Sequence, residues 1–271
     1  MQEIWFWQRI VSPHIAGLAV ALARLGCNVT YVAEQGLSDD RASQGWTLPV
    51  TPGVNVIYAE TGDAVAALAQ TAPTNAVHIC QGIRANGLVG VAQRSLAARG
   101  LLQWVLMETV NDDLWYGQIK RAVYSRLFHV RAASLQGVLA AGHRTTEWVS
   151  ARGMPADRVF PFAYFLPHVN PSEADGHCES KPYRFIFAGQ LIRRKRVDWL
   201  ITALAGLRGQ AFELCIVGAG PEEPALRALA ARELGDRVRW LGPLPLSEVP
   251  AVMAQVDCLV LPSVHDGWGA V

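Results

Sequence analysis

Short apolar runs alternate with longer amphipathic stretches through the first half of the chain. An apolar run bounded by turn residues is typical of a buried strand, whereas apolar positions spaced three and four apart indicate a helix. We expect strands at Ile4–Trp7, Asn28–Ala33, Val54–Ala59, Ala76–Cys80, Leu102–Met107 and Gly137–Ala140. We expect helices at His14–Leu25, Asp63–Gln70, Gly87–Arg99 and Gly117–Ala133. This alternation predicts an α/β fold built on parallel sheets.

The stretch from Phe165 to Pro182 interrupts the alternation. It contains several prolines and polar residues without apolar periodicity, which is typical of a linker between domains. We therefore expect an N-terminal domain over residues 1–165, a linker over 166–182 and a C-terminal domain over 183–271. The C-terminal strands are expected at Tyr183–Ala188, Phe212–Val217, Arg237–Leu241 and Cys258–Leu261, with helices at Val197–Ala205, Glu222–Arg232 and Ser247–Ala254.

The C-terminal domain is expected to be incomplete. An open α/β sheet normally carries a helix after each strand, and this chain ends at Val271 in a loop after its fourth C-terminal strand. The pattern therefore predicts a C-terminally truncated fragment of a two-domain protein.

Composition narrows the class of function. The 271 residues are 51% hydrophobic with a net charge of +1, which supplies two cores and argues against nucleic acid as a partner. Five scattered cysteines form no C-x-x-C pair, which favours a reducing, cytoplasmic location over a disulfide or zinc framework. We see no leader peptide and no apolar run of about 18 residues, so we expect a soluble protein or one that lies on a membrane surface.

A basic turn follows Gly189, directly after the first C-terminal strand. Four cations, Arg193, Arg194, Lys195 and Arg196, come directly before the helix that starts at Val197. Cationic side chains near a helix N-terminus are typical of an anion site, because the free N–H groups there already attract phosphate. The alternative is a solvated basic turn without a ligand.

A glycine turn follows the second C-terminal strand and contains Gly218 and Gly220. Glycines at such a turn allow a ligand to approach the backbone closely. A dinucleotide fingerprint would need glycine or alanine in place of Glu223, and an acid after the next strand, which ends in Gly242-Pro243 instead. The alternative of an NAD site is therefore disfavoured.

An acidic turn follows the fourth C-terminal strand and contains Asp266, Gly267 and Gly269. Taken alone, it fits an ordinary β–α turn with Asp266 near a helix start. The carboxyl ends of parallel strands meet at one edge of a sheet, however, where α/β proteins bind ligands. The basic, glycine and acidic turns together predict a nucleotide-sugar site.

Four segments in this order resemble the retaining glycosyltransferases of family 4, within group 1. They are Phe187–Ile201, Ile216–Pro221, Val238–Gly242 and Asp257–Gly269, and the run Phe160–Tyr164 resembles the family's exit from its first domain. The resemblance implies a GT-B fold, in which two Rossmann-like α/β domains face a cleft. It also implies transfer of a hexose from a nucleoside diphosphate sugar with retention at the anomeric carbon.

The resemblance implies roles for several C-terminal residues. Lys195 matches the lysine that binds the donor diphosphate, and Arg193 or Arg194 substitutes for a family arginine where this chain has Gln190. Asp266 matches the first acid of the E-x7-E pattern, which lies by the donor sugar. The second acid, which holds the donor ribose, would fall eight residues later, beyond the end of the chain.

The loop after the third C-terminal strand also takes a role from the resemblance. Leu241 and Gly242 match the segment that contacts the donor base through its backbone. The full set expected to bind the donor is Gly189, Arg193, Arg194, Lys195, Gly218, Gly220, Leu241, Gly242, Gly267 and Gly269.

The family places the acceptor and a catalytic histidine or acid on the N-terminal domain. Candidates near strand ends are His14, His78, Gln81, Arg84 and Glu108. Each is also compatible with a structural role as a hydrogen-bonded core residue. We favour His14 and Arg84, together with Asp266, as the catalytic residues.

The expected helix Gly117–Ala133 carries four cations beside four apolar positions. This pattern suits a helix that rests on an anionic membrane holding a lipid-linked acceptor. It also suits a surface helix with a solvated basic side.

We thus expect a glycosyltransferase of polysaccharide biosynthesis that transfers a hexose to a hydroxyl of a glycan or lipid-linked acceptor. Neither a metal nor another cofactor is expected, because the basic turn can neutralise the departing diphosphate. Two alternatives share the fold: a non-catalytic nucleotide-sugar-binding protein and a sugar-nucleotide epimerase, which needs no acceptor.

Overall fold

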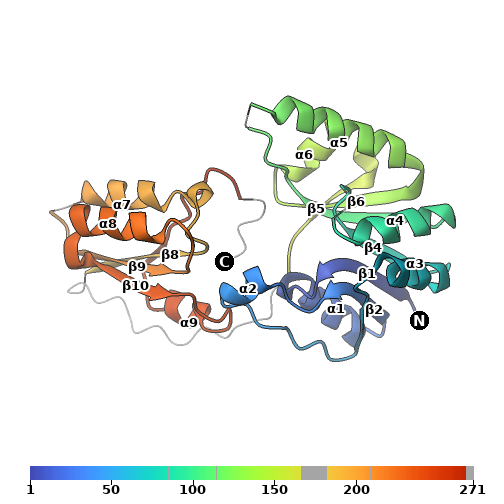
Figure 1. Ribbon diagram of the computed structural model, residues 1–271, viewed down its shortest axis with the longest axis horizontal. Helices are drawn as coiled ribbons and strands as arrows, with labels where there is room; N and C mark the ends of the chain where they lie inside the picture. The colour runs from blue at the N-terminus through green and yellow to red at the C-terminus, as the bar shows by residue number, and fades with distance from the viewer. Residues whose placement is uncertain (85, 114, 166–181, 208, 267–271) are drawn as a thin grey trace. The chain divides into compact units, whose positions relative to one another are not determined.

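The computed structural model describes residues 1–84, 86–113, 115–165, 182–207 and 209–266. The chain forms two compact units, each built around its own parallel sheet (Figure 1). Unit 1 comprises Met1–Ser38 and Leu48–Pro167, and unit 2 comprises Asp39–Thr47 and His168–Val271. The expected α/β fold is confirmed.

Unit 1 contains a seven-stranded parallel sheet in the order β3-β2-β1-β4-β5-β6-β7. Its strands are β1 (Glu3–Ile10), β2 (Asn28–Gln35), β3 (Val54–Tyr58), β4 (Val77–Gln81), β5 (Gln103–Glu108), β6 (Leu135–Ala141) and β7 (Val159–Phe162). Its helices are α1 (Pro13–Arg24), α3 (Gly62–Thr71), α4 (Val89–Ala98), α5 (Gly117–Arg131) and α6 (Thr145–Ser150).

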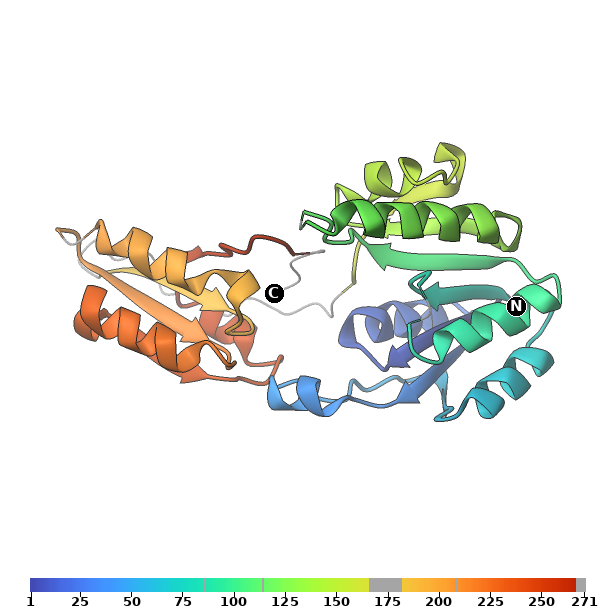
Figure 2. The ribbon, with the colours of Figure 1, turned by 45° about the horizontal axis from the view of Figure 1, so that its top comes forward.

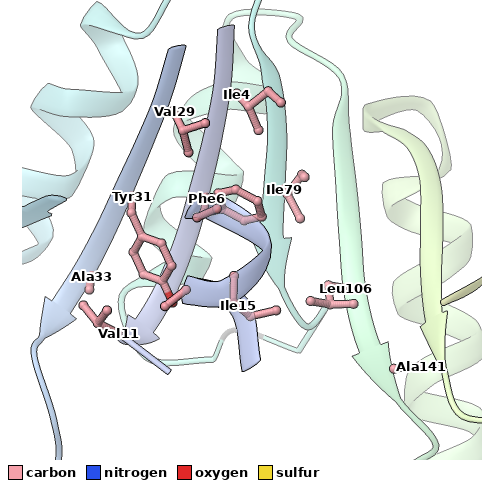
Figure 3. Close-up of a cluster of buried hydrophobic side chains, with 12 residues drawn as sticks. Ile4, Phe6, Val11, Ile15, Val29, Tyr31, Ala33, Ile79, Leu106 and Ala141 are labelled. Carbon is pink, nitrogen blue, oxygen red and sulfur yellow. The ribbon is translucent and has the colours of Figure 1, made fainter. Parts of the chain in front are cut away.

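The alternation of side chains along β1 explains how this sheet is covered on both faces. Ile4 and Phe6 point to the face that packs against Ile15 of α1 (Figure 3). Trp5 and Trp7 point to the opposite face, in the cluster that includes apolar residues of α3 and α4. Because successive strand residues face opposite ways, an uninterrupted apolar strand must be covered on both sides.

Unit 2 contains a four-stranded parallel sheet in the order β10-β9-β8-β11. Its strands are β8 (Tyr183–Ala188), β9 (Phe212–Val217), β10 (Val238–Gly242) and β11 (Cys258–Leu259), and its helices are α7 (Val197–Ala205), α8 (Glu223–Glu233) and α9 (Val249–Met253). Helices α7 and α8 lie on one face of the sheet and α9 on the other (Figure 1). Because all four strands are parallel, their carboxyl ends lie at the same edge of the sheet.

A short segment from the first half of the sequence, Asp39–Thr47, belongs to unit 2. It contains the helix α2 (Asp39–Ser43), which lies beside the loop after β10 in both ribbon views (Figure 1, Figure 2). The expected domain boundaries did not anticipate that the chain enters unit 2 twice. Most of the expected linker, residues 166–181, lies outside the described residues.

All strands and helices expected from the sequence are present, with small differences at their ends. Apart from short 3-10 helices, three short elements among the described residues were not expected, namely α2, α6 and β7. Cys27, Cys80, Cys215 and Cys258 are free thiols. Across the described residues, none of the helices combines the length and apolarity that crossing a membrane requires.

Candidate functional site

The basic turn between β8 and α7 is a 3-10 helix, Arg193–Lys195, followed by Arg196 in the left-handed conformation with φ 51°. A long side chain rarely adopts this conformation, so the surrounding contacts must stabilise it. The Arg196 guanidinium donates hydrogen bonds to Asp198 at 3.0 and 2.6 Å and lies 3.8 Å from the centre of the Trp199 ring. Arg196 is thus engaged with the start of its own helix.

The acidic turn after β11 is held directly against the basic turn. Lys195 Nζ donates to both carboxylate oxygens of Asp266, at 2.7 and 2.8 Å, and Arg194 Nη1 donates to Asp266 Oδ1 at 2.6 Å. The backbone N–H of Val264 also donates to the Arg194 carbonyl at 3.0 Å. These contacts bring together two segments that lie about 70 residues apart in sequence.

The charge of Asp266 is stabilised by this arrangement. Burial alone would raise the pKa of the Asp266 carboxyl, but hydrogen bonds from Lys195 and Arg194 and the charge of Lys195 outweigh it and lower that pKa. The Lys195 side chain is only 12% exposed, so its charge is screened less than that of a surface lysine. Asp266 is therefore ionised at neutral pH.

The glycine turn after β9 packs backbone to backbone against the turn after β8. The N–H of Leu191 donates to the Ala219 carbonyl at 2.9 Å. A Cβ on Gly218 would lie 1.9 Å from the Gly189 carbonyl oxygen, and one on Gly220 would lie 2.4 Å from the Leu191 oxygen. The close packing of the two turns therefore explains why both positions are glycine, whether or not a ligand binds there.

The end of β10 joins the same group of turns. The N–H of Gly218 donates to the Gly242 carbonyl at 2.7 Å, and Gly242 has a φ of 68°. Leu241 packs on the sheet face that carries Cys215 and Val217. The turns after β8, β9, β10 and β11 are thus directly connected, as expected for neighbouring strand ends.

Most of the residues expected to bind a donor therefore lie in one connected group in unit 2. Arg193 lies in the same turn as Lys195, but its side chain is exposed. Gly267 and Gly269 fall outside the described residues.

In unit 1, three side chains gather near the carboxyl ends of the strands. The imidazole of His14, at the start of α1, stacks on the ring of Tyr164, with centroids 5.1 Å apart and an interplanar angle of 23°. The Tyr164 hydroxyl donates to Glu108 Oε1, at the end of β5, at 2.7 Å. Burial raises the pKa of Tyr164, and the charge of Glu108 raises it further, so the phenol keeps its proton.

The contacts of Tyr164 with His14 and Glu108 were not predicted from the sequence. The residue lies in the run after β7 that resembles the family's exit from its first domain, but no local pattern links it to Glu108, which precedes it by 56 residues. The aromatic residue beside a predicted domain exit was the only available signal.

The other candidates of unit 1 have separate partners. Arg84 is exposed and lies by Tyr124 of α5, where its charge and hydrogen bond partly offset the rise that burial causes in the pKa of Tyr124. Gln81 Oε1 accepts the backbone N–H of Arg9 at 3.0 Å. Neither contact links Arg84 or Gln81 to the stacked pair of His14 and Tyr164.

His78 is a buried core residue. Its Nδ1 accepts a hydrogen bond from Trp7 Nε1 at 3.4 Å, and its pKa is lowered to about 4 by burial and, secondarily, by the charge of Arg99. The imidazole is therefore neutral at pH 7 and has the structural role that the sequence left open.

Within the part of the chain that the structure describes, no three His, Cys, Asp or Glu side chains gather in a way that would hold a metal ion.

The C-terminal segment of the chain is similar to known sequences. The family model of glycosyl transferases group 1 matches residues 182–271. The 2-deoxystreptamine glucosyltransferase of Streptomyces kanamyceticus is 37% identical over 86 residues, which are 31% of this chain and 22% of that protein. The 2-deoxystreptamine N-acetyl-D-glucosaminyltransferase of Streptomyces fradiae is 41% identical over 66 residues, 24% of this chain and 15% of that protein. The matched segments thus span less than a quarter of these relatives.

Comparison with solved structures covers nearly the whole chain. Anabaena Alr3699/HepE in complex with UDP and glucose aligns with a TM-score of 0.67 and 16% identity, over 98% of this chain and 76% of that one. The apo form of the lipopolysaccharide outer core galactosyltransferase WaaB aligns with a TM-score of 0.63 and 17% identity, over 99% and 76%. Residues 182–271 are therefore similar to the glycosyl transferases of group 1, and the chain that contains them has the α/β fold of GT-B glycosyltransferases.

Proposed function

We propose that this chain belongs to an enzyme that transfers a hexose from a nucleoside diphosphate sugar to a hydroxyl group, with retention at the anomeric carbon. The observation that carries the proposal is the contact of Lys195 and Arg194 with Asp266 inside the segment that matches glycosyl transferases group 1. This contact brings cations and an acid together where strand ends meet the start of a helix, a place that favours anion binding and so supports the proposal.

In this proposal, Lys195 is the main ligand of the donor diphosphate. Its ammonium has three N–H donors, and Asp266 orients the group through two of them. Arg194 and Arg193 add positive charge on the same turn. Breaking the bond between the sugar and the diphosphate leaves negative charge on the leaving group, and fixed cations stabilise that charge as it develops.

The remaining donor contacts would be made by backbone. We propose that Leu241 and Gly242 contact the base through their peptide groups, while Gly189, Gly218 and Gly220 keep the strand ends close to the ligand. Gly267 and Gly269 are proposed to continue this surface. Asp266 would also lie by the donor sugar.

We propose UDP-hexose as the donor. The structure of HepE holds UDP and glucose, and the two curated relatives are named for the transfer of glucose and N-acetylglucosamine. The segment that the family model matches, residues 182–271, contains the proposed donor contacts.

The acceptor would be bound by unit 1, which lies outside the segment that the family model matches. We propose a glycan or lipid-linked hydroxyl as the acceptor, with His14 as the group that takes its proton and Tyr164 and Glu108 as the pair that positions His14. Arg84 is proposed as a second acceptor contact.

A peripheral position on an anionic membrane fits the exposed face of α5 in this proposal. Ile119 and Val130 are about two-thirds exposed there, and Arg126 lies between them on the same face. Apolar residues beside a cation are typical of helices that lie on a membrane surface.

The test is a panel of nucleotide sugars offered with and without acceptors. We expect UDP to bind in calorimetry, a UDP-hexose to be consumed only when an acceptor is present, and chelators to leave the rate unchanged. 2-Deoxystreptamine and a lipid-linked glycan are the first acceptors to compare. Conversion of the donor alone into an epimer would identify an epimerase, and binding without turnover for any acceptor would favour a non-catalytic binding protein.

A further inference from the structure

The segment Asp39–Thr47 ends its helix with a tightly defined turn. Gly45 has a φ of 82°, its N–H donates to the Ala42 carbonyl at 3.0 Å, and the N–H of Trp46 donates to the Arg41 carbonyl at 3.1 Å. These two bonds form a Schellman motif, in which the left-handed residue is glycine because a side chain is disfavoured there. The guanidinium of Arg41 lies 4.5 Å from the centre of the Trp46 ring and closes the turn on itself.

This turn is docked on the loop that follows β10. The N–H of Leu246 donates to the Gly45 carbonyl at 3.3 Å. A Cβ on Gly45 would lie 2.1 Å from the Leu244 carbonyl oxygen and 2.7 Å from its carbonyl carbon. Because those are backbone atoms, no side-chain rotation could relieve the contact, so only glycine allows the segment to sit there.

The loop beneath this segment leads directly to the proposed donor site. Leu244 packs with Leu241 on the sheet face that carries Val217, and Gly242 accepts the hydrogen bond from the Gly218 N–H. The backbone of this loop is therefore fixed at one end by Gly218 and at the other by Gly45. Two fixed points define where the peptide groups of Leu241 and Gly242 point.

We propose that the segment Asp39–Thr47 positions part of the donor site. Gly45 allows the segment to dock on the loop Gly242–Leu246 and so to hold that loop in the conformation that selects the nucleotide base. This inference rests on the proposed function, and it adds a part of the chain outside the matched family segment to the donor site. The element acts on the base-contacting loop and leaves the diphosphate ligand Lys195 untouched.

The chain offers a matched control for this idea. Gly26 has a φ of 85° and also closes a Schellman motif, since its N–H donates to the Ala23 carbonyl and the N–H of Cys27 donates to the Leu22 carbonyl. A Cβ on Gly26 would meet nothing within 4 Å. Gly26→Ala therefore carries the same backbone strain as Gly45→Ala without the clash.

The experiment compares the full chain with its Gly45→Ala and Gly26→Ala variants. Calorimetry measures the affinities for UDP, ADP and inorganic pyrophosphate, and hydrogen exchange follows the amide of Leu246. We expect Gly45→Ala to speed hydrogen exchange at the Leu246 amide and to weaken the binding of UDP about tenfold. The preference for UDP over ADP should fall, while the affinity for pyrophosphate should stay the same. Gly26→Ala should leave all four readouts unchanged.

Two results would overturn the inference while the proposed function stands. The first is an unchanged UDP affinity and base preference in Gly45→Ala. The second is an equal loss of UDP and pyrophosphate binding, which would indicate that the substitution merely unfolds unit 2. If the unaltered chain bound none of the nucleotides, the proposed function itself would fail, and this inference with it.

Discussion

At the scale of single residues, the cations of the basic turn differ in what they contact. Arg196 is occupied by Asp198 and Trp199, and Arg193 is exposed. Lys195 is the most shielded of them, with a side chain 12% exposed against 39% for Arg194. A shielded cation interacts more strongly with an anion than a solvated one does. Lys195 should therefore dominate diphosphate binding.

Replacing Lys195 by alanine tests this ranking. A hydrogen bond to a charged group contributes about 1.5–3 kcal/mol, so Lys195→Ala should weaken UDP binding by roughly tenfold to a hundredfold. Arg232→Ala, on the solvent side of α8 with a side chain 69% exposed, serves as the control and should bind UDP normally. Calorimetry at fixed salt makes the comparison. Equal affinities in the two variants would remove Lys195 from the donor site.

The neutral imidazole of His78 makes the stability of the chain depend on pH. Its pKa is about 4 in the folded chain against 6.5 for an ordinary histidine, so the unfolded chain binds more protons between these values. The free energy of unfolding is therefore highest above pH 6.5 and should fall as the pH drops towards 4.

Urea unfolding between about pH 7 and about pH 5 measures this dependence. His78→Asn keeps an acceptor for Trp7 Nε1 and removes the titration, so its stability should be lower but flatter with pH than that of the unaltered chain. His129→Asn, on the exposed side of α5, is the matched control for the substitution itself. An unaltered slope in His78→Asn would mean that other groups cause the pH dependence.

At the scale of elements, one carboxylate ties the loop after β5 to two helices. Asp112 Oδ2 accepts hydrogen bonds from Arg121 of α5 at 2.7 Å, from Trp148 of α6 at 3.0 Å and from Arg152 at 3.0 Å. Burial opposes the charge of Asp112, but the hydrogen bonds from Arg121 and Trp148 lower its pKa overall. The side chain is only 11% exposed, so these bonds are protected from water.

Asp112→Asn should therefore destabilise unit 1. Asparagine presents a single acceptor and no charge to three donors, and the loss should be about 1.5–3 kcal/mol. Asp113→Asn changes the neighbouring, exposed carboxylate in the same way and should cost almost nothing. Urea unfolding at pH 7 compares them, and an equal stability of both variants would show that the contacts of Asp112 contribute little.

The elements that the sequence predicted share a strong local pattern, and the three it missed lack one. β7 is four residues long and contains Pro161, which cannot donate to a ladder and is tolerated because β7 is the edge of its sheet. α2 and α6 are five and six residues long, too short for an apolar period to emerge. Parallel strands at the centre of a sheet are easier to predict because both their faces are buried.

The candidate site divides in the same way. The turn Gly189–Lys195 and Asp266 were predictable because each follows a strand, and the ends of parallel strands converge. The contacts of Tyr164 with Glu108 and of Gly45 with Leu246 were not, since each joins residues far apart in sequence through a single hydrogen bond. Such pairs depend on where the chain folds back, which no local pattern contains.

At the scale of the whole molecule, the two units have separate cores. Val138 and Phe6 belong to two clusters made of unit 1 residues, whereas Leu214 and Phe187 belong to one cluster made of unit 2 residues. Proteins with separate cores often fail to unfold in a single step. We therefore expect two unfolding transitions in calorimetry. Leu214→Ala should lower the midpoint of the unit 2 transition and Val138→Ala that of the unit 1 transition, which assigns each transition to its unit.

UDP should then raise only the transition that Leu214→Ala lowers. A ligand at a hundredfold excess over its Kd stabilises the native state by about 2.7 kcal/mol, which shifts the midpoint of a unit of this size by roughly 10 °C. Because every proposed donor contact lies in unit 2, the midpoint of the transition that Val138→Ala lowers should not change with UDP. If both transitions moved equally with UDP, the nucleotide would be bound by residues of both units, and a donor site confined to unit 2 would be wrong.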